Sequence, residues 1–187
     1  MKDMQNPNDI EFAKFNGDQN SEVISLFQKT FSDSEGDKEG LIISDLVSKL
    51  LSETAEADIH VFIAMLGNRI VGCSIFSTMT FNHPVKAFIL SPMAVDSDYQ
   101  GRGIGKALIQ FSIENLKNKN VDFVFTYGDT NFYSKSGFKN VSDKKIPPPF
   151  PLEYPEGWLG QSLGNKNIDD LEGQFQCVEP LNREDLW

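Results

Sequence analysis

The sequence predicts an α/β domain, from the order of its elements and from one glycine-rich loop. Alternating or branched apolar runs are typical of strands, and apolar stripes three or four residues apart are typical of helices. The 187 residues read as a strand, two helices, three strands, a helix, a strand, a short helix and late strand material. The segment "GRGIG" stands directly between the fourth strand and the third long helix.

The first elements lie before residue 52. Residues 9–15, "DIEFAKF", alternate apolar and polar side chains and predict a strand. Residues 21–31 carry an apolar stripe that predicts a helix, with Asn20 or Ser21 able to cap it. A second helical pattern runs over 41–51, and we expect the acidic segment between the two, "SDSEGDKEG", to be a loop.

A β-hairpin and the glycine loop form the middle of the chain. The runs "IHVFIAML" and "IVGCSIFSTMTF" flank Gly67 and Asn68, a pair typical of hairpin turns. A third apolar run leads straight into the glycine loop. The remaining expected elements are a strand over 87–95, a helix over 104–119, a strand over 121–128, a short helix ended by Gly137 and a strand over 175–180. We find no repeat and no long linker, so we expect one domain over 1–187.

Charge and composition exclude several classes of protein. The formal charge of −10 disfavours a nucleic-acid partner, because binding nucleic acid needs a positive protein surface. The same negative charge is compatible with a cationic acceptor. No stretch approaches the roughly 20 apolar residues of a membrane span, so we expect no membrane partner. The start, "MKDMQNPNDI", has no apolar run like that of a secretory signal, and we expect a cytoplasmic protein.

The cysteines and histidines argue against disulfide and metal sites. Cys73 and Cys177 are the two cysteines, too few for a disulfide framework, so we expect thiols in a reducing compartment. The chain has no CxxC pair and two histidines, His60 and His83. We therefore expect no metal.

Three kinds of glycine loop are compatible with a strand followed by a helix, and their spacing separates them. A nucleoside-triphosphate loop that ended at Gly105 and Lys106 would need a glycine at position 100 and a Ser or Thr at position 107. Gln100 and Ala107 stand there instead, so this kind of loop fails. A dinucleotide loop also fails, because its third glycine is missing. A tight turn with positive φ would need one or two glycines. The remaining pattern, [Q/R]-x-x-G-x-[G/A], offers backbone N–H groups and a positive helix end to a pyrophosphate.

With this loop, the sequence resembles the GNAT superfamily of N-acetyltransferases, in which the loop holds the pyrophosphate of acetyl-coenzyme A. The resemblance is strongest over 87–138 and fits the element order of nearly the whole chain. It implies a three-layer α/β/α fold with a mixed, mostly antiparallel sheet that is splayed at a bulge in the fourth strand. The cofactor-binding residues that it implies in the loop are Gln100, Gly101, Arg102, Gly103, Ile104, Gly105 and Lys106.

Pro92 supports the expected bulge. A proline cannot donate to a strand ladder, so it belongs at an edge strand or at a bulge, and the neighbouring elements place this run inside the sheet. By resemblance, the Met93 N–H would face the thioester carbonyl. Ala94 and Val95 would pair with the pantetheine arm as an added strand does.

The segment "NFYSKSGF" matches the family's Y-x-x-x-G-F pattern. Tyr133 would then be the general acid that protonates the departing thiolate, although a tyrosine that packs on its helix is the alternative. Members often have an asparagine about two turns earlier, where Thr126 stands here. Asn131 is the candidate to replace that cofactor contact, and Asp129 is the expected N-cap.

The general base and the acceptor site have weaker signals. No carboxylate stands in "AFIL" before the bulge, and His83 is more typical of a loop residue than of a base. The proline-rich passage 144–163 excludes regular helix or strand. Its aromatics Phe150, Tyr154 and Trp158 are expected to cover the core rather than line an acceptor cleft. The passage resembles a little-characterised bacterial GNAT subgroup.

The resemblance implies direct acetyl transfer. A neutral primary amine of a small molecule, peptide or protein would attack acetyl-coenzyme A, with Met93 and Tyr133 as the catalytic residues. A non-catalytic acyl-coenzyme A sensor is the alternative, and the missing base is its support. The partners would be acetyl-coenzyme A and the amine, and a homodimer is compatible with the pattern.

Overall fold

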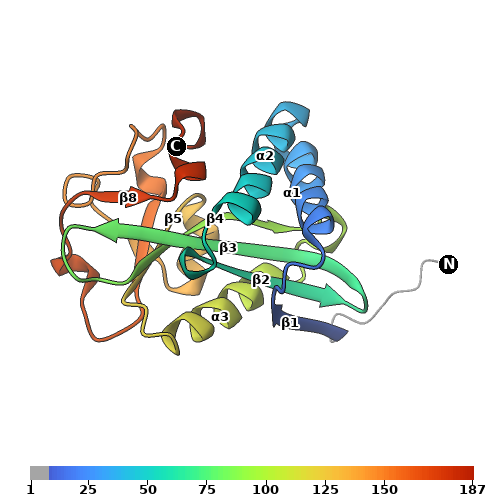
Figure 1. Ribbon diagram of the computed structural model, residues 1–187, viewed down its shortest axis with the longest axis horizontal. Coiled ribbons are helices and arrows are strands. Elements are labelled where there is room, and N and C mark those ends of the chain that lie inside the picture. The colour runs from blue at the N-terminus through green and yellow to red at the C-terminus, as the bar shows by residue number, and fades with distance from the viewer. Residues whose placement is uncertain (1–8) are drawn as a thin grey trace.

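The computed structural model describes residues 9–187, and Figure 1 shows its helices and strands. The strands are β1 (Ile10–Lys14), β2 (Ile59–Leu66), β3 (Arg69–Phe81), β4 (Ala87–Val95), β5 (Phe123–Tyr127), β6 (Lys139–Asn140), β7 (Trp158–Ser162) and β8 (Phe175–Cys177). The α-helices are α1 (Asn20–Glu35), α2 (Asp37–Glu53), α3 (Ile104–Lys117) and α4 (Thr130–Tyr133). Residues 1–8, where we expect no export signal, lie outside the described residues.

The sheet is mixed and mostly antiparallel. Its strand order is β1-β2-β3-β4-β5-β7-β6, with β8 paired to β3 beside this path. Every pair of neighbours is antiparallel except β4 and β5, which are parallel. Helices α1 and α2 cover one face and α3 covers the other (Figure 1). The expected three-layer arrangement is therefore confirmed.

Two buried clusters fill the space between the layers. The first, which we call the α1/α2-side core, joins Val23, Leu26 and Phe27 of α1 and Leu46 and Leu50 of α2 to the sheet. The second, the α3-side core, joins side chains of α3 to the other face. Its members include Phe62, Phe76, Phe88, Leu108, Ile109 and Ile113. Helix α3 thus packs mainly against β2 and β3, while β4 ends and α3 begins at the glycine loop.

The acidic segment 32–40 is not a loop, contrary to expectation. Helix α1 runs to Glu35, and α2 starts at Asp37. Gly36 turns the chain with a φ of +97°, a left-handed value that glycine adopts at little cost. A Cβ on Gly40 would collide with the Ser32 side chain, so this second glycine lets the two helices meet closely. Acidic residues in the first turn of α2 also favour the helix start.

The proline-rich passage is irregular only up to Gly157. After the last proline the chain forms β7, which lies between β5 and β6. Trp158 is fully buried and stacks on Phe125 with ring centroids 5.5 Å apart. The expectation that the whole passage lacks regular structure is wrong for 158–162, because Trp158 fills the α1/α2-side core and Leu159 fills the α3-side core.

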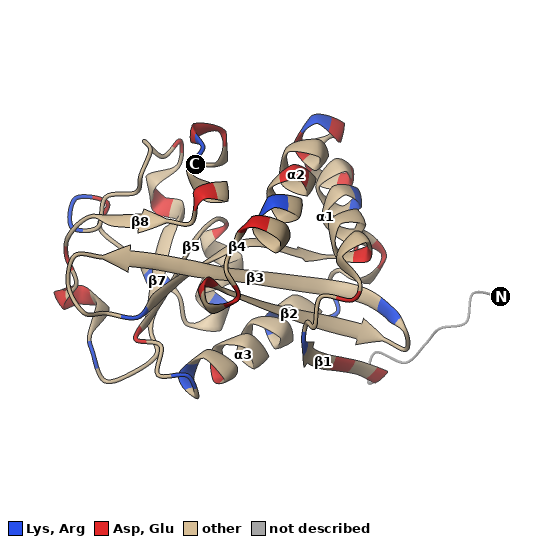
Figure 2. Cartoon of the chain, in the orientation of Figure 1, with Lys and Arg blue, Asp and Glu red and all other residues tan. Residues whose placement is uncertain are grey.

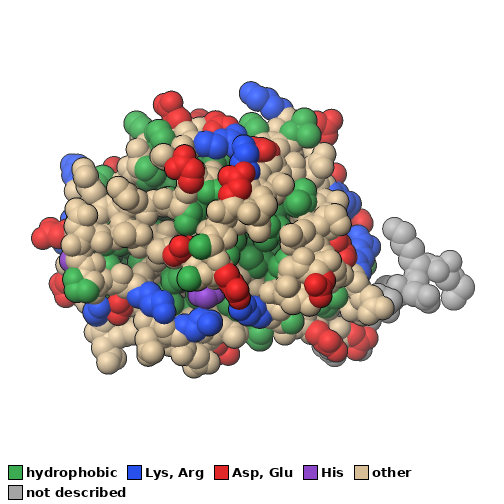
Figure 3. Space-filling model, viewed as in Figure 1, with side chains coloured by type: hydrophobic (Ala, Val, Ile, Leu, Met, Phe, Trp, Pro, Cys, Tyr) green, Lys and Arg blue, Asp and Glu red, His purple; other side chains and the backbone are tan. Residues whose placement is uncertain are grey.

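Most charged side chains of the described residues lie on the outside of this architecture. Figure 2 shows the long strand β3 with charge only near its start, where Arg69 stands. In Figure 3 charged side chains of both signs surround hydrophobic side chains near the middle of the face in view. Among residues 9–187, no helix combines the length and the hydropathy that crossing a bilayer requires.

Candidate active site

The sheet opens between β4 and β5. The two strands pair in parallel from Ala87 to Leu90, where Leu90 stands opposite Thr126. The Thr126 hydroxyl donates to the Leu90 carbonyl oxygen at 3.0 Å and closes the last pair. Strand β4 continues along β3 as far as Val95. Beyond Leu90, therefore, β4 pairs with β3 on one side and is unpaired on the side of β5, which ends at Tyr127, and we call this unpaired stretch the gap.

The predicted bulge lies at the start of this gap. Phe76 of β3 pairs with Leu90, and Ser74 pairs with Met93, so two residues of β4 stand opposite one residue of β3. Pro92 is one of those two residues. Because proline has no N–H to donate, it fits this interruption of the ladder. The bulge in the fourth strand is confirmed, and Met93 is the first residue after it.

The glycine loop connects this opening to the start of α3. Gly101 and Gly103 have φ angles of +74° and +80°, and Gly103 is the N-cap of α3. A Cβ on either glycine would meet nothing within 4 Å, so the space above the loop is open. The Ala107 N–H bonds to the Gly103 carbonyl, which leaves the N–H groups of 104–106 without partners inside the helix. The first turn holds no acid, and the Lys106 side chain is exposed.

The polar side chains of the loop hold its shape. Gln100 Nε2 donates to the Val95 carbonyl at 2.9 Å. Arg102 donates to the Asp98 carbonyl at 3.1 Å, and its guanidinium lies 5.2 Å from the centre of the Tyr99 ring. Both residues were predicted to contact the phosphates. In the structure their side chains brace the loop, and its backbone forms the open surface.

Asp96 anchors the loop at its base. Its buried carboxylate accepts hydrogen bonds from Lys29 of α1 at 2.8 Å and from Arg69 of β3 at 2.6 Å. It also accepts from the Asp98 N–H at 3.0 Å. Burial alone would raise the pKa of the Asp96 carboxyl, but these hydrogen bonds hold it below its ordinary value. One anion thus ties α1 and β3 to the chain that enters the loop, a contact that the sequence did not reveal.

Helix α4 begins just beyond the end of β5. As predicted, Asp129 caps it by accepting a hydrogen bond from the Asn131 N–H at 2.9 Å. The short helix passes into a 3₁₀ turn and ends at Gly137, which has a φ of +91°. This cap places Asn131, the expected cofactor contact, at the exposed start of the helix.

Tyr133 is held by rings on both sides. Its ring meets Phe132 edge to face with centroids 5.0 Å apart, and it meets Phe138 in the same way at 5.6 Å. The residue is half-buried against the α3-side core. Burial raises the pKa of the phenol above its ordinary value. At neutral pH, Tyr133 therefore carries the proton that a general acid needs.

Met93, the third glycine of the loop and α4 come together at one point. A Cβ on Gly105 would lie 3.1 Å from Phe132 Cζ and 3.4 Å from Met93 Cε. Gly105 therefore allows β4, α3 and α4 to converge. The predicted residues Met93 and Tyr133 thus belong to elements that meet at the loop. Phe132 completes this meeting point, although nothing in its sequence context distinguished it.

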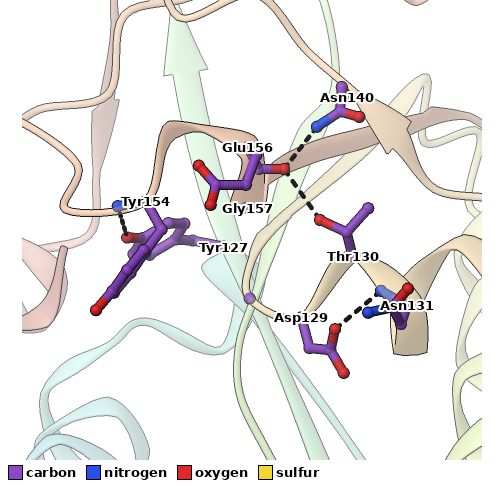
Figure 4. A pocket seen from close by; sticks show the side chains of 9 residues that line it. Tyr127, Asp129, Thr130, Asn131, Asn140, Tyr154, Glu156 and Gly157 are labelled. Atoms are coloured by element: carbon purple, nitrogen blue, oxygen red, sulfur yellow. Dashed lines mark hydrogen bonds between the residues drawn. The ribbon is translucent and has the colours of Figure 1, made fainter.

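A cavity of about 660 Å³ opens at the end of β5. Figure 4 shows the side chains around it, which come from β5, α4, β6 and the segment before β7. Its lining residues are Tyr127, Gly128, Asp129, Thr130, Asn131, Asn140, Tyr154, Glu156 and Gly157. Tyr154 therefore lines a cavity instead of covering the core. Glu156 was not singled out from the sequence, because isolated acidic residues in a proline-rich passage match no motif.

His83 and Phe150 line no part of this cavity. His83 is exposed in the loop before β4, at the end of that strand opposite to the bulge, and its ring lies tilted against Phe81 with centroids 5.6 Å apart. This position agrees with the loop reading of His83. Phe150 is half-buried in the proline-rich passage.

Cys73 is buried, Cys177 is half-buried, and neither is bonded to the other. Residues 9–187 bring no three His, Cys, Asp or Glu side chains together in a way that could hold a metal ion.

Known structures share this architecture. The GNAT family N-acetyltransferase YhbS of Escherichia coli, solved in complex with CoA, superposes with a TM-score of 0.79 at 18% identity, over 93% of this chain and 92% of that chain. A GNAT family acetyltransferase of Brucella melitensis, solved with acetyl-CoA, gives a TM-score of 0.67 at 19% identity, over 91% and 97%.

Sequence comparison gives the family directly. The family model described as an acetyltransferase (GNAT) domain matches residues 57–140, from just before β2 to the end of β6. The uncharacterized N-acetyltransferase YjhQ of Escherichia coli (strain K12) is 32% identical over 143 residues, which cover 73% of this chain and 78% of that protein. The chain belongs to the GNAT family of acetyltransferases.

Proposed function

We propose that this protein transfers the acetyl group of acetyl-coenzyme A directly to a primary amine. As a GNAT acetyltransferase it takes acetyl-coenzyme A as its co-substrate, and similar structures were solved with CoA and acetyl-CoA. One observation carries the proposal. The gap between β4 and β5 after Leu90 leads into a loop whose helix N-terminus is open and free of acids.

The glycine loop is the proposed pyrophosphate site. Backbone N–H groups of 101–106 would donate to the phosphate oxygens, and the positive end of α3 would favour their charge. The open space above Gly101 and Gly103 supports this role, because a side chain at either position would stand in that space. Lys106, exposed on the first turn, would add a positive charge.

Strand β4 is the proposed site of the pantetheine arm. Beyond the bulge its backbone is free of β5, so Ala94 and Val95 can pair with the arm as an added strand does. The Val95 carbonyl already accepts from Gln100, which fixes this part of the strand. Asn131, at the exposed start of α4, would contact the coenzyme from the facing side.

The chemistry needs one hydrogen-bond donor and one acid. A neutral amine nitrogen attacks the thioester carbonyl carbon, and the Met93 N–H stabilises the negative oxygen that develops, an effect worth about 3 kcal/mol in comparable sites. The carbon–sulfur bond then breaks, and Tyr133 gives its proton to the thiolate. The amine loses one proton to water, and the phenol regains one from water.

The direct test is a turnover screen. The protein is incubated with acetyl-coenzyme A and, in turn, polyamines, aminoglycosides, amino acids and peptide N-termini, and both free thiol and acetylated amine are measured. We expect thiol and acetylated product to appear in equal amounts with at least one amine class. Tight coenzyme binding with no product from any class would favour a non-catalytic sensor instead.

We also propose one acetyltransferase domain over 1–187 and a cytoplasmic location. The pairing of β8 with β3 supports a single domain, because it joins the end of the chain to the centre of the sheet. The two unbonded cysteines suit a reducing compartment.

A further inference from the structure

We infer that the cavity at the end of β5 binds the acceptor and selects an amine that carries a second positive charge. This rests on the proposed function, because the acceptor's other amine would receive the acetyl group. Glu156 would bind the second ammonium group, and the rings of Tyr127 and Tyr154 would flank it. The chemical class is a diamine or polyamine rather than a simple monoamine.

The first argument is the position of the cavity relative to the two faces of the sheet. Met93 and Tyr133 pack against the α3-side core, as does the helix that follows the glycine loop. Tyr127 packs against the α1/α2-side core. With the thioester on the α3 side, as this proposal has it, the side of the sheet where Tyr127 packs is left for the acceptor.

Gly128 connects the cavity to the proposed acid. It lines the cavity, and a Cβ built on it would come within 2.8 Å of Tyr133 Cε2. Asn131, the proposed coenzyme contact, lines the cavity as well. The cavity and the proposed reaction site therefore share a wall.

The charge of the cavity is the second argument. Its lining includes two carboxylates, those of Asp129 and Glu156, and no Lys, Arg or His. Asp129 is engaged in capping α4. Among the described residues, no Lys, Arg or His forms an ion pair with Glu156. A carboxylate without a counter-ion, facing a cavity without cations, favours a positively charged ligand.

The third argument is that the backbone of Glu156 is held in place. Its backbone carbonyl accepts hydrogen bonds from the Thr130 hydroxyl of α4 and from Asn140 of β6 (Figure 4). Two elements thus fix the peptide that carries the carboxylate. The ligand then has to order only the Glu156 side chain and not its backbone, which lowers the entropic cost of binding.

The tyrosines are fixed by the same segment. The Tyr154 N–H donates to the Tyr127 hydroxyl at 2.9 Å. Gly157 lets the chain pass close to Tyr127, because a Cβ there would lie 3.0 Å from that ring. Tyr154 leaves 58% of its surface exposed, and it is one of the residues that line the cavity. Exposed aromatic faces beside a carboxylate suit an ammonium group through cation–π contact.

Two amines of equal length test this inference. Calorimetry measures the affinity of 1,6-diaminohexane and of 1-aminohexane for the CoA-loaded protein, for Glu156→Gln and for Glu172→Gln. The last variant loses the same charge at an exposed residue outside the cavity. We expect the diamine to bind about tenfold more tightly than the monoamine to the wild type and to Glu172→Gln. Glu156→Gln should lose that preference.

Equal affinity for the two amines, absence of diamine binding, or a preference that survives in Glu156→Gln would each overturn the inference. The proposed function has a separate readout, namely product formation. If the diamine binds as expected but is never acetylated, the cation site stands and transfer to this class is wrong. If both amines are acetylated with equal kcat/KM, the transfer stands and the charge selection is wrong.

Discussion

Gly128 lies directly against the edge of the Tyr133 ring, because a Cβ on Gly128 would come within 2.8 Å of Tyr133 Cε2. Real Cβ atoms do not approach so closely, so Gly128→Ala has to displace the ring. We expect kcat to fall by about tenfold or more while acetyl-coenzyme A affinity holds, since a small misplacement of a catalytic group is costly.

The matched control for this substitution is Gly164→Ala. A Cβ on Gly164 would meet its nearest atom at 3.9 Å, which is ordinary contact. Steady-state kinetics of the two alanine variants compare them directly. An unchanged kcat in Gly128→Ala would mean that the position of the phenol does not limit the reaction.

Tyr133→Phe tests the acid itself. The change removes the O–H and keeps the ring that packs between Phe132 and Phe138. We expect kcat to drop by about 10²-fold, the lower end for general acid catalysis, with little change in coenzyme affinity. If kcat stays at the wild-type value, another group protonates the thiolate. A loss of affinity that matches the loss of rate would make Tyr133 a binding residue.

Asp96→Asn tests the anchor beneath the loop. The amide keeps the shape of the side chain but loses the charge that binds Lys29 and Arg69. Both cations are about half exposed and can return to water, so we expect a loss of about 1–3 kcal/mol in unfolding free energy. Urea unfolding measures it, with Asp143→Asn, an exposed position, as the control. Equal stability of the two variants would show that the anchor contributes nothing.

His60 gives the fold a pH dependence. Burial, with Lys119, Lys14 and Lys86 nearby, lowers its pKa from 6.5 to about 4. Between pH 6.5 and 4, therefore, His60 is protonated in the unfolded chain and neutral in the folded chain. The unfolding free energy is therefore unaffected by His60 above pH 6.5 and falls by on the order of 2–3 kcal/mol as the pH falls toward 4.

His60→Leu removes that titration. We expect the unfolding free energy of the wild type to fall more steeply between pH 6.5 and 4 than that of His60→Leu, as measured by urea unfolding at each pH. Identical slopes would contradict the lowered pKa of His60.

The sequence predicted the parts of the site that depend on backbone chemistry. "GRGIG" has too many glycines for a simple turn, and Pro92 cannot donate within a strand, so both patterns predict local structure with a stated cause. The turn at Gly67 and Asn68 and the cap at Asp129 are predictable for the same reason. Each depends on the residue itself and on its immediate neighbours.

Other features depend on tertiary contacts that no local pattern contains. The segment 32–40 is polar enough for a loop, but packing at Gly40 lets the helices meet with Gly36 alone between them. Strand β7 forms because Trp158 is buried beside Phe125, far away in sequence. The position of Glu156 depends on hydrogen bonds from Thr130 and Asn140, which are distant in sequence. The cavity that these residues line could therefore not be predicted.

The most direct test of the coenzyme site is a calorimetric titration of CoA into the wild type, Gly103→Val and Gly17→Val. Both glycines have positive φ, +80° and +91°, and a Cβ on either meets nothing within 4 Å, so the two substitutions impose comparable backbone strain. Gly17 lies between β1 and α1 and is not part of the loop. Circular dichroism confirms that each variant is folded. The proposed site predicts that the wild type and Gly17→Val bind one CoA with equal affinity and that folded Gly103→Val binds at least 100-fold more weakly. Equal affinity in all three proteins would contradict the assignment of the glycine loop as the coenzyme site.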